Sequence, residues 1–298
     1  MPRLGQLLGI IRIPFLALTP VCVLLGVASA YWVTKNLAIA YALLALLGAF
    51  MAHISVNALN EYIDFQSGLD FHTQRTPFSG GSGVLPAAPT LAPWAWWIGT
   101  GALIVTVIIG LGFIYLRGAE LLPLGLLGIG VIASYSTWIQ RHPFLCLIAP
   151  GLGFGPLMVV GTHFVEAGQF NATAISVSLI PFFLASGLLL VNQLPDIEAD
   201  ASVGRRHYPI LIGRLASCYL YGALLMGSYL ALIVGVLLEL MPIASLLGLM
   251  TAPIAVAAYL GLRRLANVRH NAELIPAMAR NVLVTLVTPL LIAVGFVL

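Results

Sequence analysis

Residues 37–70 read LAIAYALLALLGAFMAHISVNALNEYIDFQSGLD, an apolar run that becomes polar before it ends. The apolar part is long enough to cross a hydrocarbon core of about 30 Å, which takes roughly 20 helical residues. Residues 57–70 then bring three acids and two asparagines into a chain in which only 8% of residues are charged. The stretch therefore predicts a membrane helix that carries a polar site at one end.

The rest of the chain repeats the apolar pattern. It has 298 residues, of which 60% are hydrophobic, and a mean hydropathy of +1.04. This composition excludes an ordinary soluble domain and predicts a multi-pass integral membrane protein. The expected membrane helices span residues 13–33, 37–59, 94–115, 120–139, 144–165, 172–194, 215–238, 243–262 and 281–298.

Basic residues predict the orientation of these helices, because Lys and Arg are retained on the cytoplasmic side. With nine spans, only Lys35 and Arg117 of the 13 basic residues fall on one side, which leaves 13 − 2 = 11 on the other. That richer side holds Arg3, Arg12, Arg75, Arg141, Arg205, Arg206, Arg214, Arg263, Arg264, Arg269 and Arg280. We therefore expect a cytoplasmic N-terminus. No basic cluster is dense enough to indicate a nucleic-acid partner.

Two polar segments, residues 60–92 and 195–214, lie on the predicted cytoplasmic side. A set spaced i, i+3, i+4 and i+7, on one helical face, leads into the first segment: Asn57, Asn60, Glu61 and Asp64. A set spaced i, i+4 and i+8 leads into the second: Asn192, Asp196 and Asp200. We expect each set to be a polar stripe that continues an apolar helix. The similar spacing of the two also suggests an internal duplication.

The simplest interpretation of one such stripe is a polar cap where a helix leaves the bilayer. Two stripes favour another interpretation, because an ionised acid costs up to about 2.5–3.5 kcal/mol at the centre of a membrane helix. Neighbouring carboxylates also repel each other unless a cation lies between them. Oxygen ligands without His or Cys at matching spacing favour Mg²⁺ over Zn²⁺. The stripes therefore predict a divalent metal site.

Arginines follow both stripes, with Arg75 after the first and Arg205 and Arg206 after the second. Magnesium held by a few carboxylates keeps positions open for phosphate oxygens, and arginines bind the same oxygens. This mixture of acids and bases predicts a diphosphate ligand. An isoprenoid tail on that diphosphate would give the membrane helices a second role, to shelter the tail.

Four stretches carry a family resemblance: Asn60-x3-Asp64-x5-Asp70, RTPFSGGSGVL at 75–85, GFGPLMVVGTHF at 153–164 and NQLPDIEADASVGRR at 192–206. They resemble the UbiA superfamily of intramembrane prenyltransferases, whose members have Asp-rich motifs after the second and sixth of nine transmembrane helices. Gly68 stands where many relatives have a third Asp. This spacing is similar to the MenA branch, the 1,4-dihydroxy-2-naphthoate polyprenyltransferases of menaquinone synthesis.

The resemblance covers residues 1–298 as a single domain. It implies an all-α bundle of nine transmembrane helices around a central cavity, in a bacterial plasma membrane, with the polar segments 60–92 and 195–214 as cytoplasmic caps. It also implies Mg²⁺-dependent transfer of a polyprenyl group from an allylic diphosphate to an aromatic acceptor.

The implied catalytic residues would hold two Mg²⁺ ions: Asn60, Asp64, Asp70, Asp196 and Asp200. The residues expected to contact diphosphate are Asn57, Arg75, Asn192, Arg205 and Arg206. Candidates to contact the acceptor or to stabilise an allylic cation are His53, Tyr62 and Tyr135.

Two departures from the family pattern leave the acceptor open. YSTWIQRHPFLCL at 135–147 replaces a basic segment of relatives, and GRRHYP at 204–209 replaces a common Gly-Lys-x-Thr-Leu pattern. A non-quinone acceptor, such as a glycerol phosphate or a tetrapyrrole, is the alternative within the family. A transporter with an acidic ion site is the alternative from another class. A transporter predicts acids spread through membrane depth, whereas these acids cluster at one face.

Overall fold

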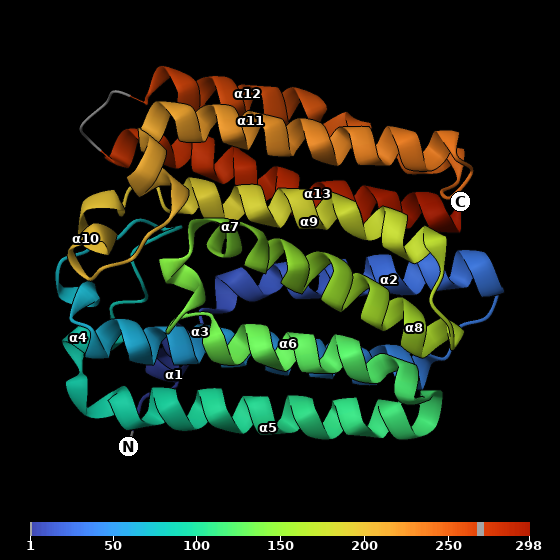
Figure 1. Ribbon diagram of the computed structural model, residues 1–298, viewed down its shortest axis with the longest axis horizontal. Helices are drawn as coiled ribbons and strands as arrows, with labels where there is room; N and C mark the ends of the chain where they lie inside the picture. The colour runs from blue at the N-terminus through green and yellow to red at the C-terminus, as the bar shows by residue number, and fades with distance from the viewer. Residues whose placement is uncertain (1, 267–270) are drawn as a thin grey trace.

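The structure, a computed structural model, describes residues 2–266 and 271–298, and all regular secondary structure within these ranges is helical. The long helices lie side by side along the longest axis, and the two termini lie at opposite ends of the bundle (Figure 1). The elements are α1 (Leu4–Ile10), η1 (Ile13–Ala17), α2 (Leu18–Thr34), α3 (Ile39–Gln66), η2 (Leu69–Phe71), α4 (Val84–Ala87), η3 (Pro89–Leu91), α5 (Ala92–Arg117), η4 (Ala119–Leu121), α6 (Leu122–Ser134), η5 (Ile139–Arg141), α7 (Pro143–Leu152), η6 (Gly153–Val160), α8 (Gly161–Ala167), α9 (Ala172–Asn192), α10 (Ile197–Ser202), α11 (Tyr208–Leu237), η7 (Ile243–Thr251), α12 (Ala252–Arg264), η8 (Asn271–Leu274) and α13 (Ile275–Val297).

Helical segments match the nine predicted spans. Within the described residues, eight are long and apolar enough to cross a membrane, and a shorter apolar segment covers Ala119–Ser134. The eight are Ile13–Thr34, Ile39–Gln66, Pro89–Arg117, Pro143–Ala167, Ala172–Asn192, Tyr208–Leu237, Ile243–Arg264 and Asn271–Val297. The prediction of an all-α membrane bundle is confirmed. Arg269, which entered the orientation argument, lies outside the described residues.

The fourth predicted span is shorter than expected. We expected a helix over residues 120–139, but α6 ends at Ser134. The Ser134 hydroxyl donates to the carbonyl oxygen of Gly130 at 2.6 Å, a local hydrogen bond that competes with the helix backbone. Residues 135–142 instead form a turn and η5 at the polar end of the bundle.

The second predicted span is longer than expected, because α3 continues through the polar stripe to Gln66. Gly68 follows in the left-handed region, with φ of 79°, which is the usual way for a helix to end. The single helical face predicted for Asn57, Asn60, Glu61 and Asp64 is confirmed by this continuous helix.

The same prediction is wrong for the second stripe. Helix α9 ends at Asn192, and Asp196 is the N-cap of the separate short helix α10. Pro195 lies between them, has no backbone N–H to continue a helix, and disfavours helical geometry at the preceding residue. Asp196 and Asp200 are therefore placed by a turn and a short helix, not by an extended α9.

The fifth span is irregular and borders the cavity described below. It consists of α7, the π-helical η6 and α8, with Pro150 and Pro156 inside it. Gly155 allows η6 to approach α9, since a Cβ at this position would lie 2.5 Å from the carbonyl oxygen of Ser178. Small residues permit such close packing between membrane helices.

Candidate active site

A cavity of about 610 Å³ joins the polar end of the bundle to its apolar interior. Its apolar walls come from α3, α5, α6, η6 and α9, with His53, Ala52 and Phe154 among the lining residues. Its polar end is formed by residues from both predicted motifs: Asn60, Asp64, Asp70, Asn192, Asp196, Asp200 and Arg205. The two polar segments, far apart in sequence, therefore line one compartment.

The first motif reaches the cavity from a helix and the turn that follows it. Asn60 and Asp64 lie one turn apart on α3, and the Asn60 side-chain amide donates to Ser136 Oγ at 3.0 Å. Asp70 lies on η2, beyond the left-handed turn at Gly68. Both aspartates are buried, with exposed fractions of 5% for Asp64 and 4% for Asp70. The turn thus returns the chain to the same cavity.

The second motif reaches the cavity from the connection between α9 and α11. Asn192 ends α9, Asp196 begins α10, and Asp200 lies within α10. Ser79 and Gly80, in the loop after the first motif, line the same cavity as Asp196 and act to lower its pKa. The loop after the first motif therefore lies beside the second.

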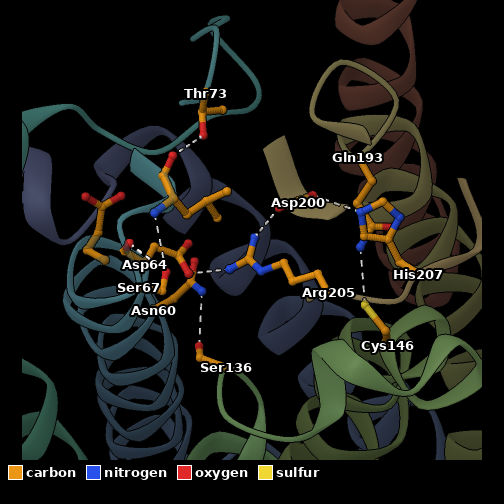
Figure 2. Close-up of polar contacts among 12 residues, drawn as sticks. Asn60, Asp64, Ser67, Thr73, Ser136, Cys146, Gln193, Asp200, Arg205 and His207 are labelled. Carbon is orange, nitrogen blue, oxygen red and sulfur yellow. Dashed lines mark hydrogen bonds and ion pairs between the residues drawn. The ribbon is translucent and has the colours of Figure 1, made fainter. Parts of the chain in front are cut away.

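Arg205 connects the two motifs (Figure 2). Its Nη2 donates to Asp64 Oδ1, and its Nη1 donates to Asp200 Oδ1 at 2.7 Å. Burial alone would lower the pKa of Arg205, but the two carboxylates outweigh this effect and raise it. Arg205 is therefore a fully charged, buried cation between the motifs.

Asp200 is held by a second partner. His207 Nε2 lies 2.8 Å from Asp200 Oδ2. Burial acts to raise the pKa of Asp200, but the hydrogen bond from His207 and the positive charge of Arg205 outweigh it and lower the pKa. Asp200 is therefore ionised and bonded through both oxygens.

Four other oxygens of cavity-lining residues at this end are buried and have no hydrogen-bond partner among the described residues: Asp70 Oδ2, Asp196 Oδ1, Asn192 Oδ1 and Gln140 Oε1. Burial, followed by the charges of Glu61 and Asp64, raises the pKa of Asp70 to about 7. Burial, followed by the charge of Asp200, raises the pKa of Asp196 to about 7. Buried acceptors need a partner, and carboxylate and amide oxygens are the ligands that Mg²⁺ takes. The donor set therefore fits Mg²⁺.

The carboxylates of the two motifs do not converge on one metal position in this structure. Across residues 2–266 and 271–298, no three side chains of His, Cys, Asp or Glu are placed to hold a metal ion together. Arg205 lies between Asp64 and Asp200 instead. A metal ion that used these two carboxylates would require Arg205 to move.

Other predicted residues divide into two groups. His53, Asn57 and Tyr135 line the cavity, and His53 is held by Thr19 Oγ1 at 2.8 Å from its Nδ1. Asn57 donates its side-chain amide to the carbonyl oxygen of Ile11 at 3.0 Å. By contrast, Arg75, Arg206 and Tyr62 lie outside the cavity lining.

These three residues have other surroundings. Arg75 and Arg206 are exposed, and the Arg75 guanidinium packs against Gly83. Tyr62 faces α5, where its ring centroid lies 5.3 Å from that of Trp96. Their predicted functional roles remain predictions.

Arg12 is a cavity residue that the sequence did not single out. Its Nε lies 2.5 Å from Glu61 Oε1, and its pKa is raised because Glu61, Asp64 and Asp70 outweigh the opposing effect of burial. Glu61 is fully buried and also accepts from Ser82 N at 2.8 Å and from Ser82 Oγ at 2.7 Å. Glu61 thus anchors Arg12 and the glycine-rich loop at residues 79–83 (SGGSG). A fully buried carboxylate of this kind needs a cation nearby.

The glycine-rich loop passes close to the first motif. Gly81 has φ of +74°, and a Cβ there would lie 2.9 Å from Asp70 Oδ1. Only glycine suits both this backbone conformation and this close approach. Gln140, Gln193 and His207 also line the cavity and were not predicted.

Comparison with known proteins agrees with this geometry. Residues 18–283 match the family model described as the UbiA prenyltransferase family. The 1,4-dihydroxy-2-naphthoate octaprenyltransferase of Escherichia coli (strain K12) is 28% identical over 294 residues, which covers 93% of this chain and 90% of that protein.

Two solved structures share the fold. The apo UbiA homolog from Aeropyrum pernix K1 has a TM-score of 0.70 at 15% identity, over 100% of this chain and 98% of that one. The UbiA homolog from Archaeoglobus fulgidus bound to DMAPP and Mg²⁺ has a TM-score of 0.61 at 16% identity, over 97% and 99%. With the family match extending over most of its length, the chain belongs to the UbiA prenyltransferase family and is a prenyltransferase, as its motifs predicted.

Proposed function

We propose that this prenyltransferase transfers a polyprenyl group from an allylic diphosphate to 1,4-dihydroxy-2-naphthoate or a related aromatic acceptor, in menaquinone or related quinone synthesis. The observation that carries the proposal is the cavity, which joins a carboxylate-lined end to apolar helical walls. A prenyl diphosphate has the same two parts, a charged head and an apolar tail. The Escherichia coli relative is named for octaprenyl transfer to this naphthoate.

The donor head group would lie at the polar end. Asn60, Asp64 and Asp70 would hold one Mg²⁺ ion, and Asp196 and Asp200 a second. The unpartnered oxygens of Asp70 and Asp196 support this assignment. When bound, Mg²⁺ would stabilise the negative charge that develops on the diphosphate as the allylic C–O bond breaks.

Cationic side chains would contact the diphosphate directly. Arg12 and Arg205 already line the cavity, and an arginine fork suits phosphate oxygens. Arg75 and Arg206 would contribute only if their exposed side chains turned toward the cavity. Asn57, about one turn before Asn60 on α3, and Asn192, the last residue of α9, would orient the head group or its ligands.

The acceptor would meet the allylic carbon between the head group and the apolar walls. Tyr135 and His53 line the same cavity, and the face of an aromatic ring attracts a cation. Ring attack forms the new C–C bond and releases diphosphate. The acceptor then loses either a ring proton or its carboxylate as CO₂.

We place the polar end on the cytoplasmic side of a bacterial plasma membrane, because the basic residues are concentrated there. Ser202 is exposed at this end on α10. In right-side-out vesicles, a Ser202→Cys variant should resist a membrane-impermeant thiol reagent until the vesicles are opened. Labelling of Ser202→Cys in intact vesicles would contradict the proposed orientation and place the polar end on the opposite side of the membrane.

Activity of the purified protein tests the function. The protein is incubated with Mg²⁺, labelled polyprenyl diphosphates of several lengths, and 1,4-dihydroxy-2-naphthoate, 4-hydroxybenzoate or glycerol phosphate. We expect a prenylated naphthalene product by mass spectrometry, and none after EDTA treatment. Transfer to glycerol phosphate alone would contradict the aromatic acceptor. Glu198→Gln serves as the control variant, because Glu198 is an exposed acid of the second segment.

A further inference from the structure

Arg205 forms the direct ion pairs between the two motifs. It bonds one carboxylate from each, although Asp64 and Arg205 lie 141 residues apart in sequence. The guanidinium is largely buried, with a side-chain exposed fraction of 16%, against 7% for Asp64 and 5% for Asp200. Buried charges need close partners of opposite sign. The fork of Arg205 therefore compensates two buried carboxylates at once.

This arrangement occupies three of the four carboxylate oxygens that Asp64 and Asp200 could offer to a metal ion. Asp64 Oδ1 and Asp200 Oδ1 both accept from Arg205, and Asp200 Oδ2 faces His207. By contrast, Asp70 and Asp196 each have a buried oxygen without a partner among the described residues. In the described part of the chain no three acidic, His or Cys side chains converge on a possible metal position. The carboxylates of the two motifs are thus divided between Asp64 and Asp200, which Arg205 holds, and Asp70 and Asp196, each of which has one buried oxygen without a partner.

We propose that Arg205 is an internal cation that holds the two motifs together and blocks Mg²⁺ from Asp64 and Asp200 until a diphosphate arrives. This inference rests on the proposed function. Phosphate oxygens are strong acceptors for an arginine fork, so a bound diphosphate draws Arg205 away from the carboxylates. Asp64 and Asp200 are then released to bind metal. Arg205 thereby makes Mg²⁺ binding and diphosphate binding depend on each other.

The dependence has to be reciprocal. If diphosphate strengthens Mg²⁺ binding by some factor, Mg²⁺ strengthens diphosphate binding by the same factor. Coupling between sites commonly amounts to roughly 5- to 150-fold. We therefore expect Mg²⁺ alone to bind the wild-type protein weakly and to bind at least about fivefold more tightly with diphosphate present.

Calorimetric titration of the detergent-solubilised full chain tests the proposal. MgCl₂ is titrated alone and with inorganic diphosphate, into wild type, Arg205→Gln, Arg205→Lys and Arg264→Gln. Arg264 is exposed near the end of α12 and serves as a remote arginine control. The two Arg205 variants should bind Mg²⁺ alone at least about fivefold more tightly than wild type. Both should lose most of the enhancement by diphosphate, and Arg264→Gln should match wild type.

The Arg205→Lys variant separates this account from a simple charge effect. Lysine keeps the positive charge but is a single point donor, without the rigid fork that reaches two carboxylates. Tighter Mg²⁺ binding by Arg205→Lys therefore supports the blocking role. Unchanged binding by Arg205→Lys would overturn it, even if Arg205→Gln bound more tightly.

Two failures remain distinguishable. If wild type does not bind Mg²⁺ even with diphosphate, the proposed function fails. If wild type binds both together but the Arg205 variants bind Mg²⁺ alone no better, the proposed function stands and the role of Arg205 is wrong. Should Arg205→Gln not fold, Arg205→Lys and wild type decide the question, because Arg205→Lys retains a cation beside the buried acids.

Discussion

The two acidic motifs look alike in sequence but are built differently. In the first, Asn60 and Asp64 lie on the continuous helix α3, a turn leads to Asp70 on η2, and Glu61 binds Arg12 and the loop at Ser82. The second lies on a turn and the short helix α10, where Asp200 is held by Arg205 and His207. One motif is therefore positioned by helix geometry, and the other by side-chain contacts that reach across the cavity. A shared spacing of acids thus does not imply a shared local structure.

The largest expected effect is on catalysis. Substitutions in the two motifs should lower the rate to a similar extent, although the motifs are built differently. Asp64→Asn and Asp200→Asn each remove one charged oxygen ligand from the site. We expect each to lower kcat by at least about 10²-fold, the loss typical of a removed electrostatic contact to developing charge. The measurement is release of diphosphate from a labelled donor at saturating Mg²⁺.

Glu198→Gln is the matched control for these variants, since Glu198 is an acid of the same segment but is exposed. It should keep wild-type activity. Asp200→Asn with near wild-type activity, beside an inactive Asp64→Asn, would show that the first motif alone carries the chemistry.

The next effect is on stability and concerns the ion pair that supports the first motif. Glu61→Gln leaves the Arg12 guanidinium, whose side chain is only 19% exposed, without its ion-pair partner. Breaking a buried ion pair costs up to about 3–5 kcal/mol. We expect this loss in the free energy of unfolding, measured by denaturant titration in micelles. A loss no greater than that of Glu198→Gln would remove the argument that Glu61 anchors the first motif.

The smallest effect concerns the glycine that follows each motif. Gly68 and Gly204 both have φ of +79°, and neither would bring a Cβ within 4 Å of another residue. Gly68→Ala and Gly204→Ala should each cost roughly 1–2 kcal/mol, the strain of left-handed backbone in an L-residue. Thermal unfolding measures this cost.

Gly101→Ala is expected to change stability in the opposite direction. Gly101 lies within α5, and a Cβ there meets nothing within 4 Å. Alanine should stabilise this helix by roughly 0.5–1 kcal/mol. Equal effects of all three substitutions would show that the left-handed turns do not limit stability.

The sequence predicted the fold and the first motif well for a physical reason. Hydrophobic length identifies membrane helices, and a helical period places Asn57, Asn60 and Asp64 on one face as long as the helix continues. It continues in α3. The same period failed in the second motif, because Pro195 ends the helix and the period no longer applies.

Contacts between distant segments could not be predicted in this way. Arg12 and Glu61 lie 49 residues apart, and Asp64 and Arg205 lie 141 residues apart. The sequence indicated that clustered acids required a cation nearby. The packing of α3 against the segments around it determines which arginines form the ion pairs with these acids. For the same reason Tyr62 was expected near the cavity, although it faces Trp96.

The central claim is that the two motifs act as one diphosphate site, and a double-mutant cycle between Asp70 and Asp196 tests it most directly. Both have a buried oxygen without a partner among the described residues, one in each motif. Prenyl transfer is measured for wild type, Asp70→Asn, Asp196→Asn and the double variant. Residues that act as a unit are strongly non-additive, so we predict that the double variant is no slower than the slower single variant. Losses that multiply would contradict the claim, because they would show two motifs that act independently.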